Sequence, residues 1–254
     1  MISIEGLWFR YGRGSDAVLR DVSTEIPQGS ITAILGPNGS GKTTLLSILL
    51  GLLTPEKGTL RIDGRTIDEY SRATLSQMIG LVPQQEFFPL GFSVLDYVLL
   101  GRAPYLGLLE RPGPEDYAVA EGAIAQVRIE SLRERLVPSL SGGERQLTTV
   151  ARALAQCPRI LLMDEPTSHL DLANKRRVMG VIRGLADEGV TIIMTTHDPN
   201  AAAANAEYLV LMREGRVVKN ASLSEALTAE NLSYIYGVPV QVGQLDGHLV
   251  VFER

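Results

Sequence analysis

Gly36-Pro37-Asn38-Gly39-Ser40-Gly41-Lys42-Thr43 is the stretch of sequence that decides the fold. It fits the pattern G-x-x-x-x-G-K-[ST], between an apolar run at 30–35 and a helical stretch that begins near Lys42. A glycine-rich turn at a helix start aims backbone N–H groups and the positive end of the helix dipole at one point. An ordinary glycine turn is the alternative, but the strand–turn–helix context favours a cradle for phosphate. Lys42 would then reach the outer phosphates, and Thr43 would offer a hydroxyl to Mg²⁺.

The composition indicates a globular protein with a large core. Hydrophobic residues make up 45% and charged residues 21% of the 254 residues, with a formal net charge of −5. No basic tract or basic–aromatic ribbon occurs, so we expect no nucleic-acid partner. No apolar segment approaches the ~20 residues of a spanning helix, and the first residues lack the pattern of a signal peptide. We therefore expect a cytoplasmic protein whose membrane contact is made through a partner.

The spacing of apolar residues predicts two kinds of strand. Alternating apolar and polar residues predict an antiparallel β lobe at 2–11, 18–26 and 59–63. Continuous apolar runs predict parallel strands buried on both faces, at 31–35, 79–82, 160–163 and 191–195. The lone cysteine, Cys157, is expected to be a small apolar filler before Pro158.

The remaining segments predict helices and a short antiparallel tail. Prolines break a helical pattern between 95 and 156, which predicts an inserted helical subdomain. Further elements are expected as a helix at 172–187, strands at 209–212 and 217–219, a helical stretch at 223–234 and two final strands. The fold class is therefore α/β, with a mostly parallel central sheet, an antiparallel β subdomain and an inserted α-helical subdomain. We expect a single domain, 1–254, with a core at 1–90 and 158–254 and the helical subdomain at 91–157.

Two further motifs follow the glycine loop. The strand at 160–163 ends in Asp164 and Glu165. In phosphate-loop enzymes the first acid sits beside the metal and the second faces the attacking water, although two acids can also mark a simple strand exit. Ser141-Gly142-Gly143-Glu144 precedes a helical run. It is either a capped helix start or a second phosphate site at a helix N-terminus, which would serve the nucleotide of another chain.

The order of these motifs resembles that of an ABC-type ATPase subunit. The glycine loop (Walker A), the Ser-Gly-Gly-Glu signature, the acidic strand (Walker B) and His197 in Thr195-Thr196-His197-Asp198 follow one another as in that family. The resemblance covers nearly the full chain and implies a P-loop NTPase core. It also implies a head-to-tail homodimer that sandwiches two ATP molecules with Mg²⁺ between Walker A of one protomer and the signature of the other.

The resemblance assigns a role to each motif residue. Tyr11 resembles the aromatic residue that stacks on adenine, with Phe9 as its rival, and Gln84 resembles the Q-loop glutamine, with Gln85 beside it. The implied ATP-binding residues are Tyr11, Gly36, Pro37, Asn38, Gly39, Ser40, Gly41, Lys42, Thr43 and Thr44. The implied catalytic residues are Lys42, Gln84, Glu165 and His197, and the implied Mg²⁺ ligands are Thr43, Gln84 and Asp164. The residues implied to contact the opposite protomer or its ATP are Ser141, Gly142, Gly143 and Glu144, with Asp171 in the D-loop, Ser168-His169-Leu170-Asp171. One departure is Leu147, where the family often has a basic residue.

The resemblance also implies a biological role. The segments 92–102 and 167–174 look like those of importer ATPases for iron–siderophore, haem, cobalamin and molybdate. The expected partners are integral membrane permease subunits and, indirectly, a periplasmic or lipid-anchored solute-binding protein, with the chain peripheral on the cytoplasmic face of the membrane. The alternatives are the ATPase of a split exporter, or a non-transport ABC ATPase acting on nucleic acid or ribosomes, against which the acidic composition argues. The sequence does not identify the transported substrate, because the resemblance implies that other subunits bind it.

Overall fold

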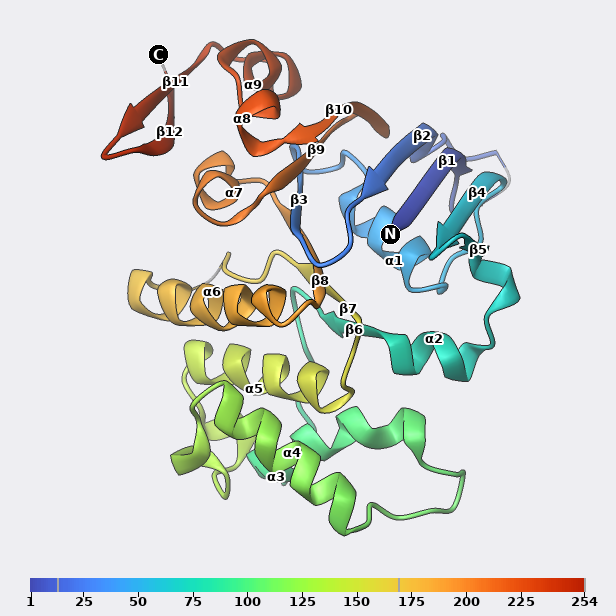
Figure 1. The fold of residues 1–254 in the computed structure, drawn as a ribbon, viewed down its shortest axis with the longest axis vertical. Helices are drawn as coiled ribbons and strands as arrows, with labels where there is room; N and C mark the ends of the chain where they lie inside the picture. Colours follow the sequence, from blue (N-terminus) through green and yellow to red (C-terminus); the bar gives the residue numbers. More distant parts are fainter. Residues whose placement is uncertain (13, 169, 254) are drawn as a thin grey trace. The chain divides into compact units, whose positions relative to one another are not determined.

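The computed structural model describes residues 1–12, 14–168 and 170–253 (Figure 1). The chain forms two compact units, one made of Met1–Arg72 with Thr191–Arg254 and the other of Ala73–Val190. The predicted helical subdomain, 91–157, falls within the second unit, and its division from a core stays a prediction. Within the described ranges, no helix combines the length and the apolar character needed to cross a bilayer.

The first unit contains the predicted antiparallel β lobe. Its four strands are arranged in the order β2-β1-β4-β5, and β1 pairs antiparallel with both β2 and β4. The bounds are β1 Ile2–Phe9, β2 Leu19–Ile26, β4 Lys57–Ile62 and β5 Arg65–Thr66. Ile2, Ile4, Leu7 and Phe9 are buried along β1, so the apolar alternation in the sequence marks the inner face of this sheet.

The first unit also carries strands β3, β8, β9 and β10. β3 pairs parallel with β8 on one side and β9 on the other, and β10 pairs antiparallel with β9. The bounds are β3 Ile31–Leu35, β8 Thr191–Thr196, β9 Tyr208–Arg213 and β10 Arg216–Ser222. Every residue of β3 is buried, as predicted for a strand covered on both faces. Two helices lie next to these strands in the chain, α1 Lys42–Leu49 after β3 and α7 Pro199–Asn205 after β8.

The end of the first unit differs from the sequence prediction. The single helical stretch predicted at 223–234 is two helices, α8 Leu223–Ala226 and α9 Ala229–Tyr236. Thr228 separates them in an extended conformation, and its side chain accepts a hydrogen bond from the N–H of Asn231. A threonine that caps the next helix in this way interrupts the preceding one. A hairpin of β11 Val240–Leu245 and β12 His248–Glu253 follows.

The second unit combines a parallel strand pair with a set of helices. β6 Ile79–Val82 pairs parallel with β7 Ile160–Asp164. The helices are α2 Arg72–Met78, which begins at the boundary between the units, α3 Val94–Leu99, α4 Pro114–Gln126, α5 Gly142–Ala155 and α6 Leu172–Asp187. α5 lies between α4 and α6 (Figure 1) and also packs against α3. α6 has the predicted bounds, and the prolines fall between the α-helices or at their starts.

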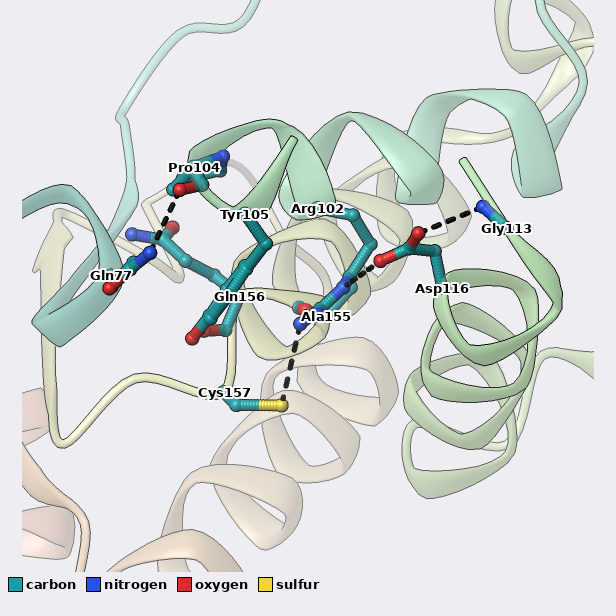
Figure 2. Close-up of polar contacts among 9 residues, drawn as sticks. All are labelled: Gln77, Arg102, Pro104, Tyr105, Gly113, Asp116, Ala155, Gln156 and Cys157. Atoms are coloured by element: carbon teal, nitrogen blue, oxygen red, sulfur yellow. Dashed lines mark hydrogen bonds and ion pairs between the residues drawn. The ribbon is translucent and has the colours of Figure 1, made fainter. Parts of the chain in front are cut away.

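Arg102 holds the helical part of the second unit together (Figure 2). Its Nε donates to Asp116 at 2.9 Å and its Nη1 to the carbonyl of Ala155 at 2.9 Å. The ion pair is well covered, with 12% and 13% of the two side chains exposed. Asp116 also accepts from the N–H of Gly113 at 2.9 Å and so caps the start of α4. One carboxylate therefore fixes both a helix start and the segment that follows α3.

Cys157 contradicts its expected role as an apolar filler. It is exposed, its φ is +50°, and its Sγ lies 3.9 Å from Nη1 of Arg102 (Figure 2). It ends α5 in a left-handed turn, which only the folded backbone reveals.

We predict that Asp116→Asn destabilises the protein in a pH-dependent way. The Gly113 N–H and, next, the Arg102 guanidinium lower the pKa of Asp116 below its ordinary value of 3.8. A lowered pKa means that the stabilisation is present above the ordinary value and is lost as the pH falls through the folded value. Thermal unfolding should give the variant a lower Tm at neutral pH, and the difference from wild type should shrink as the solution is acidified below pH 3.8.

Glu115→Gln is the matched control for Asp116→Asn. It removes the same formal charge from the same turn of α4, but Glu115 is exposed, so its effect should be small. Equal losses of Tm for the two variants would contradict the capping and ion-pair role of Asp116.

Candidate functional site

The glycine loop wraps around its own lysine. The Nζ of Lys42 donates to the carbonyls of Gly36 and Pro37 at 2.8 and 3.1 Å, and only 6% of this residue is exposed. A Cβ on Gly36 would lie 2.2 Å from the carbonyl oxygen of Met212, so no larger residue fits there. Gly41 caps α1 in the left-handed region at φ +99°, which glycine adopts without strain. The loop therefore presents its backbone, and not side chains, at the start of α1.

The residues of the loop fit a magnesium–triphosphate group. The Ser40 hydroxyl is buried and has no hydrogen-bond partner among the described residues, a costly state that a phosphate oxygen would relieve. Thr43 is exposed in the first turn of α1. Mg²⁺ prefers oxygen ligands, and the Thr43 hydroxyl is the predicted ligand that this loop and its helix supply.

Tyr11 and Phe9 differ in burial. Tyr11 is 65% exposed, whereas Phe9 is 6% exposed and belongs to the core. The two rings meet edge to face with centroids 5.0 Å apart, and the Tyr11 hydroxyl lies 3.0 Å from Oγ1 of Thr44. Tyr11 is thus held beside the helix that follows the glycine loop, with its ring available to stack on a base. This geometry supports Tyr11 over Phe9 as the adenine-stacking residue.

His197 leaves the sheet beside the glycine loop. In the parallel pair β3–β8, Leu35 lies opposite Thr196. Gly36 and His197 follow these two residues directly, and the carboxyl ends of parallel strands open at the same edge of a sheet. The first unit therefore brings together the glycine loop and the histidine that were predicted from segments far apart in the sequence.

The second unit brings together Gln84 and the two acids. In the parallel pair β6–β7, Val82 lies opposite Met163. Asp164 is the last residue of β7, and Gln84 and Glu165 follow the ends of the two strands. The Nε2 of Gln84 donates to Oε2 of Glu165 at 3.2 Å. Asp164 is buried, and Glu165 has a φ of +48°, a strained conformation for a glutamate and one that clusters at functional sites. The hydrogen bond supports Gln84, and not Gln85, as the Q-loop glutamine.

The signature motif forms a capping box at the start of α5. The Ser141 hydroxyl accepts from the N–H of Glu144 at 3.4 Å, and Glu144 accepts from the N–H of Ser141 at 2.8 Å. This backbone hydrogen bond lowers the pKa of Glu144. Gly142 is exposed. Leu147, at the position where the family often has a basic residue, is fully buried. Its side chain is therefore part of the hydrophobic core on the buried face of α5.

Asn174 links the D-loop to the signature, and sequence reasoning missed it. Asp171 caps α6 by accepting from the backbone N–H and the side-chain Nδ2 of Asn174, at 2.8 and 3.0 Å. A Cβ on Gly143 would lie 2.3 Å from Cγ of Asn174. The only signal was the Asp-x-x-Asn spacing of a helix cap. His169, within the predicted D-loop, lies outside the described residues.

These features define the class of the protein. A glycine loop between a buried parallel strand and a helix, with a buried lysine at the helix start, is the arrangement typical of a phosphate-loop nucleotide-binding site. The ABC transporter family model matches residues 19–168. The chain belongs to the ABC transporter family, and it is an ATPase.

Relatives of the chain include importer subunits. It is 35% identical over 254 residues to the "Probable iron chelatin transport ATP-binding protein" of Helicobacter pylori, with 99% of each chain covered. It is 36% identical over 236 residues to the ferric enterobactin transport ATP-binding protein FepC of Escherichia coli, with 92% of this chain and 87% of FepC covered. It is also 36% identical over 240 residues to the molybdate import ATP-binding protein MolC of Haemophilus influenzae, with 94% of this chain and 89% of MolC covered.

Solved structures confirm the predicted fold class. A chain from a structure described as a metal-chelate type ABC transporter in an inward-facing conformation has a TM-score of 0.87 and 34% identity, with 100% of this chain and 96% of that chain covered. The dimeric ABC transporter cassette MJ0796 has a TM-score of 0.77 and 30% identity, with 88% of this chain and 99% of the MJ0796 chain covered.

We predict that Tyr11→Ala weakens ATP binding about tenfold or more, because stacking of an aromatic ring on a base contributes on the order of 1–3 kcal/mol. Titration calorimetry on the purified chain would measure the Kd. Tyr11→Phe keeps the ring and should stay within about twofold of wild type. Inorganic triphosphate, which has no base, should bind wild type and Tyr11→Ala equally. A parallel loss of triphosphate binding would contradict the stacking role.

Proposed function

We propose that this chain is the ATP-hydrolysing subunit of an ABC importer for a metal chelate of the iron–siderophore or haem class. The main support for ATP hydrolysis is the hydrogen bond between Gln84 and Glu165, because it brings an amide and a carboxylate together beyond the ends of β6 and β7. The transport assignment is supported by the relatives named for iron chelatin and ferric enterobactin transport. The similar metal-chelate type transporter supports the same cargo class.

The proposed chemistry is phosphoryl transfer to water, which depends on positioning and charge neutralisation. Lys42 would bind the outer phosphate oxygens, and Glu165 would polarise the attacking water. His197 would contact the γ-phosphate. Bound Mg²⁺, held by Thr43, Gln84 and Asp164, would neutralise charge on the phosphates.

The proposed assembly is a head-to-tail homodimer. The signature, Ser141 to Glu144, would bind the nucleotide of the opposite protomer at the start of α5, since N–H groups at a helix start attract anions. The dimeric MJ0796 cassette, 30% identical to this chain, supports a homodimer. Closure on ATP and opening after hydrolysis would drive the transporter.

The proposed partners are integral membrane permease subunits and, through them, a solute-binding protein. The segment 92–102 is the proposed permease contact, and Arg102 anchors its end through Asp116 and Ala155. The chain would then be a peripheral protein on the cytoplasmic face of the membrane.

Glu165→Gln should retain ATP binding and lose turnover by about 100-fold or more, because general-base assistance is removed while the side chain keeps its shape. The purified variant with ATP and Mg²⁺ should elute as a dimer in size-exclusion chromatography. The exposed Glu130 supplies a control, Glu130→Gln, which should hydrolyse ATP as wild type does. Turnover of Glu165→Gln close to wild type would remove Glu165 from its role.

A complementation experiment tests the import assignment. A host strain without this chain should lose uptake of radiolabelled ferric chelate or haem, and only the wild-type gene, not Glu165→Gln, should restore it. Loss of molybdate uptake with normal ferric-chelate and haem uptake would overturn the proposed cargo class. Unchanged import of all three with impaired export would overturn the importer assignment.

A further inference from the structure

The turn that carries His197 contacts the C-terminal helix of the first unit. His197 lies between β8 and α7, and Tyr236 ends α9, 39 residues later in the chain. The Tyr236 hydroxyl donates to the main-chain carbonyl of His197 at 2.7 Å. No sequence motif surrounds Tyr236, so only the fold brings the two residues together.

This contact holds one end of a peptide group whose other end is also held. The carbonyl of His197 and the N–H of Asp198 belong to one planar peptide group. The carbonyl accepts from Tyr236, and the N–H donates to Oγ1 of Thr196 at 3.0 Å. With both ends bonded, the peptide plane cannot rotate freely, and the direction in which the His197 side chain leaves the backbone is fixed.

The residues after His197 are fixed as well. Asp198 caps α7 by accepting from the N–H of Asn200 at 2.8 Å. The Asn200 side chain donates from Nδ2 to the carbonyl of Val251 at 2.9 Å and accepts from the N–H of Val251 at 2.8 Å. β12 therefore holds the start of α7 while α9 holds the turn before it.

The Tyr236 hydroxyl keeps the proton that it donates to the carbonyl of His197. Burial raises the pKa of its phenol, and the nearby charge of Asp198 raises it further. The hydroxyl therefore stays protonated throughout the physiological range and can donate to the carbonyl at all times.

We propose that Tyr236 is a positioning residue that sets the orientation of His197 for ATP hydrolysis. The inference rests on the proposed function, in which His197 contacts the γ-phosphate. The Tyr236 hydroxyl bonds to the main chain of His197, so its loss would change the placement of this proposed catalytic group. The glycine loop and Tyr11, which are proposed to bind the nucleotide, are left intact. Turnover should therefore fall while nucleotide affinity stays the same.

The test is Tyr236→Phe, which removes the hydroxyl and keeps the ring. With purified protein at saturating ATP and Mg²⁺, kcat should fall about tenfold, the effect of losing one well-aligned hydrogen bond, while KM and the Kd for ATP stay within about twofold. Tyr234→Phe is the matched control, because Tyr234 lies two residues earlier on the same helix, where it does not share a face with Tyr236, and its ring packs against Arg213. This control should retain wild-type kcat. A wild-type kcat for Tyr236→Phe, or a loss of ATP affinity equal to its loss of kcat, would overturn the inference.

A double-mutant cycle with His197→Ala separates this inference from the proposed function. If Tyr236 acts through His197, then Tyr236→Phe should cause no further loss of kcat in the His197→Ala background. Independent, multiplying losses would overturn the positioning role. Wild-type turnover of His197→Ala itself would instead overturn the proposed role of His197 in hydrolysis.

Discussion

The proposed nucleotide site depends on one interaction, the hydrogen bonding of the buried Lys42 ammonium group to the carbonyls of its own loop. A charge removed from water is costly unless polar groups surround it, and the carbonyls of Gly36 and Pro37 supply part of that surrounding. The loop can close this tightly only because Gly36 has no side chain to meet the Met212 carbonyl. A phosphate group would add the opposite charge that main-chain carbonyls lack. The loop is therefore already shaped for an anion, and little of the binding energy would be spent on ordering it.

The two compact units repeat one arrangement at the ends of parallel strands. In the first, neighbouring strands β3 and β8 lead into the glycine loop and His197. In the second, neighbouring strands β6 and β7 lead into Gln84 and the two acids. Strand register alone therefore places residues from distant segments side by side. At the signature, side-chain packing has this effect: Asn174 packs against Gly143 and joins the starts of α5 and α6.

The sequence allowed prediction of those features that a short segment determines by itself. Continuous apolar runs gave the parallel strands, the glycine loop gave the helix start after it, and the order of motifs gave the family. Features that depend on contacts between distant segments could not be predicted. One such contact places the exposed Cys157 beside Arg102, 55 residues away. The Thr228 cap, by contrast, is a local signal that the sequence analysis overlooked, and it divides one expected helix into two. The link from Tyr236 to His197 spans 39 residues without any local pattern.

Glu165, the proposed catalytic carboxylate, would place activity in conflict with folding stability at one residue. Its backbone adopts a left-handed conformation, φ +48°, which disfavours a long side chain by roughly 1–2 kcal/mol. Glycine would relax this strain, and asparagine tolerates it better, but neither would keep a carboxylate of the same reach. Directed evolution that selects only for thermal robustness would thus tend to replace this residue and yield sturdier but inert variants. Libraries meant to improve this protein should therefore leave codon 165 unchanged.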